Sequence, residues 1–341
     1  MMRRSRGPLF CAALALLGCG EVEYGVEADG ERLPVIDMHL HPGDWSHTPP
    51  QTQEFLAARF PFPFQLTPER LAGRVLSPEG LASELDGAGI GTGVLFAVYA
   101  PRTVGIAANE DVIADVKSAP SRFFGLASLR VDRWNQDEAA ELMRLRTALG
   151  EPGMIGVKLA HAHQLFRMDD PRYFSIYALA GELGKPVYLH TGTSPFPGTA
   201  QAPPYTDPTY LEPAIAAHPQ TIFILGHLGY DFKDKQLGAL AACLDLASRY
   251  PNVYLEPSAL GSRSSDPTGT NLKAAMKRIR DAGLVDRVIY GSDGPQSPGF
   301  VDEYLRSTVT AMREAGYSRD EMRAVLAGNF VRVFAVPEPT Q

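Results

Sequence analysis

Short apolar runs rich in β-branched residues alternate with longer stretches of helical periodicity from residue 34 onward. This alternation is typical of strand-helix units around a parallel sheet. We count eight runs, at residues 35–41, 93–100, 123–130, 153–160, 186–192, 221–229, 252–259 and 287–295. Eight units in about 300 residues match the TIM barrel. The predicted fold is therefore an α/β single-domain (β/α)8 barrel over residues 34–336, followed by a short tail at 337–341.

The stretches between the runs carry helix start and stop signals. Residues 77–89 begin with Ser77, and residues 135–150 have acidic residues early and glycine at the end. Two more helices are expected at 301–316 and 318–334, the second opened by a Ser318–Glu321 capping box. A doubly wound sheet would also alternate strands and helices, but no glycine-rich nucleotide loop follows the first run. The barrel is the favoured fold.

The first residues differ in composition from the rest of the chain. A basic segment precedes a short apolar run that ends in Leu16-Leu17-Gly18-Cys19, which is typical of a bacterial lipoprotein signal. We expect residues 1–18 to be removed, Cys19 to carry lipid, and the acidic residues 19–33 to form a tether. The protein would then be exported and anchored to a membrane of the cell envelope. The alternatives are an ordinary signal peptide or a misassigned start.

Charge and cysteine content narrow the possible partners. The formal net charge is −7, and no run of Lys or Arg follows residue 6, so the chain lacks the basic surface that nucleic acid requires. A small-molecule substrate is expected instead, and a homo-oligomer is possible. With Cys11 removed and Cys19 lipidated, Cys243 alone remains, which excludes an intramolecular disulfide.

The first run, "VIDMHLH", places charged residues in an apolar strand. Strand side chains alternate between two faces. The prediction is that Ile36, Met38 and Leu40 face the helices, and that Asp37, His39 and His41 face the barrel interior with Val35.

Other polar residues follow later runs at the same relative position. His190 lies near the end of the fifth run, His227 near the end of the sixth and Asp293 near the end of the eighth, and TIM barrels carry their chemistry at the carboxyl ends of strands. Unpaired imidazoles and a carboxylate are costly to bury together. A divalent transition metal would satisfy them, because imidazole and carboxylate groups suit zinc or a similar ion.

Six phrases of the chain resemble the amidohydrolase superfamily, and within it the amidohydrolase-related, aminocarboxymuconate semialdehyde decarboxylase-like group. They are "IDMHLHPG", "GVKLA", "VYLHTG", "ILGHLG", "YGSDGP" and "LAGNFVRVF", spread over residues 34–335. The resemblance implies one metal, with zinc expected, held by His39, His41, His190 and Asp293. It also implies that His227 is a general acid/base. Asp37 either orients a ligand or makes a structural bond within its strand.

The role of Lys158 is open. In two-metal relatives a carboxylated lysine on the fourth strand bridges the metals, so a second metal is expected only if Lys158 is carboxylated. The chain reads Lys158-Leu159-Ala160-His161 where the one-metal group often has Leu-His-Pro after the lysine, which leaves His161 open as well. The alternative is that Lys158 forms a salt bridge inside the barrel.

Three functions remain possible. The leading hypothesis is hydrolysis of an amide, ester or lactone by metal-activated water, with Asp293 or His227 transferring the proton. The alternative is metal-dependent, non-oxidative decarboxylation, in which His227 handles a proton. A third hypothesis is a non-catalytic binding module of the cell envelope.

Two long loops, residues 42–66 and 193–210, are rich in proline and aromatic residues and are expected to form lids or specificity walls, with oligomer contacts as the alternative. Arg130 could bind an anionic substrate group, although a surface ion pair is the competing interpretation. His47 either joins the site or caps its loop, and His163 and His218 are predicted to be structural.

Overall fold

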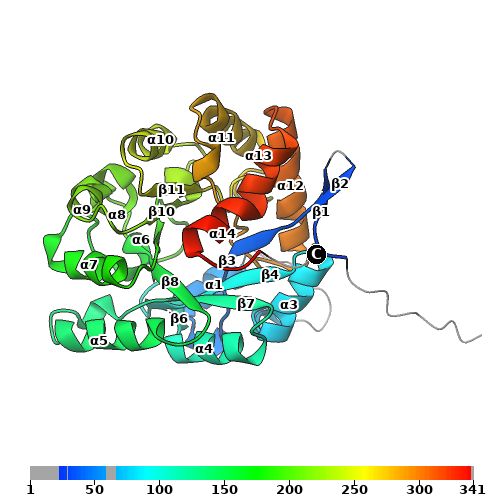
Figure 1. Cartoon of the computed structure of the whole chain (residues 1–341). Coiled ribbons are helices and arrows are strands. Elements are labelled where there is room, and N and C mark those ends of the chain that lie inside the picture. Colours follow the sequence, from blue (N-terminus) through cyan, green and yellow to red (C-terminus); the bar gives the residue numbers. More distant parts are fainter. Residues whose placement is uncertain (1–22, 29, 59–66, 339–341) are drawn as a thin grey trace, which may run out of the picture.

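The computed structural model describes residues 23–28, 30–58 and 67–338. Its centre is a curled, wholly parallel sheet of seven strands with helices around its outer face (Figure 1). In sheet order the strands are β3 (Ile36–Leu40), β4 (Thr92–Phe96), β7 (Phe123–Ala127), β8 (Met154–Leu159), β9 (Val187–His190), β10 (Phe223–Gly226) and β11 (Val253–Glu256). The fold is TIM-barrel-like, as predicted.

Helices follow the strands in alternation. They are α3 (Pro78–Gly87), α4 (Asn109–Ser118), α5 (Glu138–Leu149), α7 (Phe174–Glu182), α9 (Glu212–Ala217), α10 (Leu240–Arg249), α11 (Thr270–Asp281) and α12 (Phe300–Glu314). Ser77 caps α3 as predicted. The last expected helix consists of α13 (Arg319–Arg323), a π-helical turn (Ala324–Gly328) and α14 (Asn329–Phe334), and the Ser318–Glu321 capping box is present.

The eighth run does not form a regular strand, contrary to the prediction. It lies between β11 and β3 and touches them through isolated bridges, Leu255 with Val288 and Leu40 with Gly294. Backbone bonds from Ile289 N to Leu255 O (2.9 Å) and from His41 N to Gly294 O (2.8 Å) close the gap. Asp293 has a φ of 66°, which a strand does not accommodate. The barrel therefore closes through an irregular segment.

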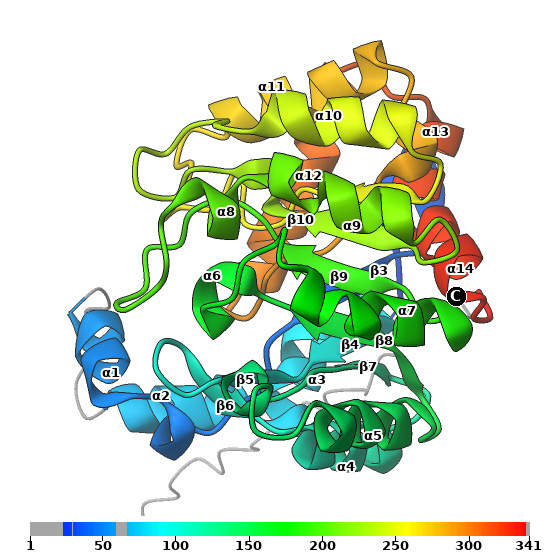
Figure 2. The ribbon, with the colours of Figure 1, turned by 90° about the vertical axis from the view of Figure 1, so that its left-hand side faces the viewer.

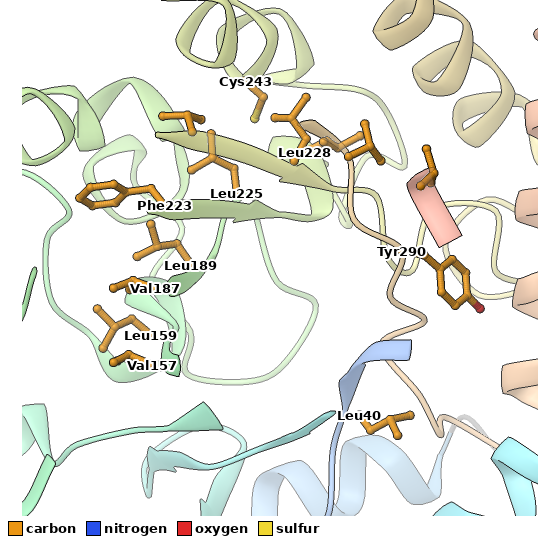
Figure 3. Packing of buried hydrophobic residues seen from close by; sticks show 14 of the residues in the cluster. Leu40, Val157, Leu159, Val187, Leu189, Phe223, Leu225, Leu228, Cys243 and Tyr290 are labelled. Carbon is orange, nitrogen blue, oxygen red and sulfur yellow. The ribbon is translucent and has the colours of Figure 1, made fainter. Parts of the chain in front are cut away.

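Two apolar clusters lie on the two faces of the sheet. The larger one contains residues between strands and helices, including Val157, Leu159, Val187 and Leu189 (Figure 3). The smaller one lies inside the barrel, because β3, β4, β7, β8, β9, β10 and Ile289 all contribute to it. Phe330 and Phe334 of α14 also belong to it, so the last helix packs on the inner cluster.

The side-chain directions in strand β3 differ from the predicted alternation. Ile36 and Met38, expected to face the helices, belong to the inner cluster, whereas Leu40 packs in the outer one. The pairing of β3 with β4 shifts between Asp37 and Leu40, and such an irregularity interrupts the two-residue period of side-chain directions. His39 nevertheless reaches the interior, where its ring stacks on Phe96 at 4.4 Å between centroids.

Part of the predicted tether forms a hairpin on the domain instead. β1 (Val26–Ala28) pairs with β2 (Glu31–Leu33), and Ala28 and Leu33 are buried in the outer cluster. Gly25 N donates to Gly89 O at 2.6 Å. Apolar residues at alternate positions give this segment a face to bury. The predicted signal peptide, Cys19 and residues 339–341 lie outside the described residues, and no helix in the described ranges is long and apolar enough to cross a membrane.

The loops at the carboxyl ends of the strands carry short extra elements. Helices α1 (Pro50–Ala57), α6 (His161–Gln164) and α8 (Pro203–Thr206) lie on the side of the molecule opposite α14 (Figure 2). Here too are α2 (Pro68–Val75) and the antiparallel pair β5 (Val98–Ala100) and β6 (Gly105–Ala107). The two long loops meet, because Phe55 packs against Phe196 at 5.3 Å between ring centroids.

Candidate metal centre

His39, His41 and Asp293 converge at the carboxyl end of β3. Asp293 Oδ1 lies 3.1 Å from His39 Nε2 and 3.0 Å from His41 Nε2, and the two nitrogens lie 3.0 Å apart. Within the described residues, these three form the group of side chains that could hold a metal ion. Three of the four predicted ligands therefore meet as expected.

The other ring nitrogen of His39 is enclosed by polar groups. Nδ1 lies 3.2 Å from Glu256 Oε1, 3.1 Å from Ser258 Oγ and 3.0 Å from Tyr188 Oη. Tyr188 and Ser258 also donate to Glu256 Oε2, at 3.1 and 2.7 Å. A carboxylate beside Nδ1 keeps the proton on that nitrogen. The Nε2 lone pair of His39 is then directed toward Asp293 and His41 and is free to bind a metal.

Electrostatics favour the ionisation states that a metal requires. Burial lowers the pKa of His39 well below its usual value, so its imidazole is neutral. For Asp293, burial opposes ionisation, but His39, His41 and His227 outweigh it and lower the pKa of the carboxyl. Neutral imidazoles and an ionised carboxylate are the forms that bind divalent metals. The donor set therefore fits a zinc-class ion.

His227 lies beside this group, and its Nδ1 is hydrogen-bonded to Ser258. Its Nδ1 is 3.2 Å from the carbonyl oxygen of Ser258 and 2.9 Å from Ser258 Oγ. Because a carbonyl only accepts, Nδ1 carries the proton and Nε2 is free to accept one. His227 and Asp293 both have positive φ, 61° and 66°, a strained conformation that costs about 1–3 kcal/mol and concentrates at functional sites.

His190, the fourth predicted ligand, is not part of the three-residue group. Its ring lies 4.6 Å from His227 and 4.6 Å from His163 between centroids. The Nε2 atoms of His190 and His163 are both buried without a hydrogen-bond partner in the described chain. An unsatisfied buried donor or acceptor costs about 1–3 kcal/mol. His163, predicted to be structural, is therefore brought to the edge of the site.

Asp37 acts on the backbone of the site. Its carboxylate accepts from His39 N at 3.0 Å and from Ser292 N and Oγ at 2.9 and 2.5 Å. Burial raises the pKa of Asp37 to about 7, against the lowering effect of these hydrogen bonds. The side chain ties the strand that carries His39 to the segment that carries Asp293.

Three further candidates lie in different surroundings. Lys158 is buried, with Nζ over the rings of Tyr188 (4.1 Å) and Phe96 (4.8 Å), and burial lowers its pKa to about 7. Asp293 and Glu256 oppose this lowering electrostatically, although neither forms a salt bridge with Lys158 among the described residues. His161 points elsewhere, with Nε2 3.2 Å from Tyr177 Oη. Arg130 forms an ion pair with Asp132 at 2.7 Å. This is the surface ion pair that was predicted as the alternative to binding an anionic substrate group.

Sequence reasoning missed Glu256, Ser258 and Tyr188. Glu256 ends β11, as His190 ends β9 and His227 directly follows β10, so the strand-end signal could have found it. Tyr188 reads as an ordinary core residue. Of the remaining histidines, His47 is exposed in a turn at Trp45–His47 and His218 bonds Ala214 O at the end of α9.

Comparisons with known proteins agree with this architecture. A family model described as "Amidohydrolase" matches residues 36–336. A search of curated proteins finds no match. Among solved structures, an uncharacterized TIM-barrel protein from Bordetella bronchiseptica is 22% identical with a TM-score of 0.67, covering 89% of this chain and 99% of that one.

Two other solved structures carry functional descriptions. One is a probable 2-pyrone-4,6-dicarboxylic acid hydrolase from Acinetobacter baumannii (18% identity, TM-score 0.59, 89% of this chain and 100% of that one). The other is a dihydroxybenzoic acid decarboxylase from a Polaromonas species with bound manganese (18%, 0.60, 89% and 97%). At this level of identity the likeness concerns the fold.

Proposed function

Because this chain belongs to the amidohydrolase family, we propose that it is a metal-dependent hydrolase of a small molecule with an amide, ester or lactone bond. The observation that carries the proposal is the convergence of His39, His41 and Asp293 within about one hydrogen-bond length of one another. His190, whose Nε2 is buried and unpartnered, is proposed as a further ligand. A divalent metal bound there would polarise a carbonyl and lower the pKa of water.

The side chains around the metal site have separate proposed roles. Glu256 holds His39 through Nδ1 and so fixes which nitrogen faces the site. His227 accepts the proton that the attacking water loses and returns it to the leaving group, since Ser258 holds its Nδ1 and leaves Nε2 free. Phe96 and Tyr188 pack on the His39 ring and restrict water around it.

The test is a screen of protein loaded with Zn²⁺ or Mn²⁺ against lactones, esters, amides and unsaturated carboxylic acids. Metal-dependent formation of a new carboxylate, alcohol or amine supports the hydrolase. His227→Asn should retain bound metal and lose most of the turnover. Turnover that needs no metal, or a His227→Asn protein as active as the wild type, would refute the assignment.

A second candidate is non-oxidative decarboxylation. It is favoured by Lys158, a buried cation that forms no ion pair among the described residues, and by the similarity to the Polaromonas decarboxylase. His227 would then protonate the carbon that loses carbon dioxide. Carbon dioxide release without a hydrolysis product from the same screen separates this reaction from hydrolysis.

We also propose that the protein is exported and held at a membrane by lipid on Cys19, as the lipoprotein signal indicates. Growth with a labelled fatty acid tests this, because wild-type protein should incorporate label and Cys19→Ser should not. Label retained by Cys19→Ser would contradict the anchor.

A further inference from the structure

The ammonium group of Lys158 is buried near Asp293 and Glu256, which stabilise the cation electrostatically but form no ion pair with it. Lys158 is 3% exposed, and its Nζ makes no hydrogen bond or ion pair with the described part of the chain. Its contacts are the faces of Tyr188 and Phe96, at 4.1 and 4.8 Å from the ring centroids. Two ring faces contribute about 2 kcal/mol or slightly more, whereas removing an ammonium from water costs several kcal/mol. The cation is only partly compensated.

The nearby carboxylates are occupied elsewhere. Asp293 faces His39 and His41 at 3.1 and 3.0 Å. Glu256 faces His39 at 3.2 Å and accepts from Tyr188 at 3.1 Å. Both oxygens of Glu256 are thus engaged, and neither carboxylate forms an ion pair with Lys158. A direct ion-pair partner of the ammonium would therefore be an anionic group from outside the chain.

The other unsatisfied groups in this region are also nitrogens. Lys158 and Tyr188 are register partners on adjacent strands, and His190 follows Tyr188 by two residues on the same strand face. The His190 ring lies 4.6 Å from His163, and Nε2 of each is buried without a partner in the described ranges. As a metal ligand, His190 Nε2 carries no proton and does not bind an anion, so the ammonium of Lys158 is the group that is complementary to an anionic oxygen ligand.

We propose that Lys158 anchors a carboxylate group of the substrate, and therefore that the enzyme acts on small carboxylic acids. The inference deepens the proposed function and rests on it. Phe96 contacts both Lys158 and the metal site. Lys158 Nζ lies over its ring, and the same ring stacks on the His39 ring at 4.4 Å between centroids. The carboxylate would thus bind beside the reacting group.

Calorimetric titration with matched anionic and neutral probes tests the anchor, using acetate and benzoate against acetamide and benzamide. The full chain is titrated without metal and again after loading with Zn²⁺, so that binding to the metal is separated from binding to lysine. We expect the carboxylates to bind at least about ten-fold more tightly than the amides, and Lys158→Met to lose about ten-fold or more of that affinity. The control is Lys185→Met, whose Nζ donates to Met154 O at 2.8 Å outside the site.

Two results would overturn the anchor. One is a folded Lys158→Met protein that binds the carboxylates as the wild type does, and the other is a wild type that binds none of them. If Lys158→Met does not fold, Lys158→Arg should keep the preference and Lys158→Gln should lose it. Finding Lys158 carboxylated, with two metals bound per chain, would also reject the anchor. If the enzyme hydrolyses only neutral esters and needs metal to do so, the carboxylate anchor is rejected but the proposed hydrolase function stands. If the protein binds no metal, the proposed function itself is rejected.

Discussion

Nδ1 of His39 lies 3.2 Å from a carboxylate oxygen of Glu256, and both side chains are fully buried. This contact assigns the proton of His39 to Nδ1 and directs the Nε2 lone pair toward Asp293 and His41. Burial raises the pKa of Glu256, and the hydrogen bond from Ser258 opposes that rise. The pair therefore holds the imidazole of His39 in the orientation that a metal ligand needs.

Replacing Glu256 with glutamine should weaken metal binding by about 10- to 100-fold, since an amide holds the Nδ1 proton less firmly than a carboxylate. Calorimetric titration of metal-free protein with Zn²⁺ measures the change. Glu182→Gln is the matched control, because Glu182 lies on the surface and pairs with Arg146. Equal affinities for the wild type and Glu256→Gln would show that this contact does not orient His39.

Gly226 should not tolerate a side chain. An alanine Cβ there would lie 1.9 Å from Tyr188 Oη, so the phenol would have to leave His39 and Glu256. We expect Gly226→Ala to lower the free energy of unfolding by about 1–3 kcal/mol and to weaken Zn²⁺ binding as well. Urea denaturation and metal titration measure the two effects.

Gly87→Ala provides the control, because nothing lies within 4 Å of a Cβ at that helical position. It should stabilise the protein by about 0.5–1 kcal/mol. A Gly226→Ala protein as stable as Gly87→Ala would mean that the Tyr188 ring moves without cost.

The buried His161 should make stability depend on pH. Burial lowers its pKa from 6.5 to about 3, so the unfolded chain binds the proton more readily between these values. The contribution of the neutral ring is complete above pH 6.5 and is lost as the pH falls toward 3, by up to about 1.4 kcal/mol per pH unit. Urea denaturation of metal-free protein between pH 7.5 and 5 should show a shallower decline for His161→Leu. Parallel curves for the two proteins would contradict this.

Much of the site follows from one sequence signal, namely a polar residue directly after an apolar run. That signal found His190, His227 and Asp293, while alternation within the first run found His39 and His41, and the same strand-end signal also applies to Glu256. Tyr188 could not be found this way, because a tyrosine within a strand gives no sign that its hydroxyl meets a ligand. His163 approaches His190 only through the short turn of α6, which spacing does not reveal.

The barrel fold was predicted in outline. The structure differs from the prediction at the eighth run and in β3, where the backbone departs from a regular strand. The eighth run has the composition of a strand, but the positive φ at Asp293 prevents regular pairing. In β3, Ile36 and Met38 lie on the inside, and the pairing with β4 shifts register between Asp37 and Leu40. Both departures lie at residues of the metal site, because the register shift in β3 spans His39 and the positive φ belongs to Asp293.

The metal content of the purified protein tests the central claim most directly. We expect about one divalent transition metal per chain after loading with Zn²⁺ or Mn²⁺, measured by elemental mass spectrometry. His39→Ala and Asp293→Asn should each lose it, while His218→Ala, with its ring on the Ala214 carbonyl, should keep it. A wild-type protein that cannot be loaded with either metal, or full metal content in both ligand variants, would contradict the account.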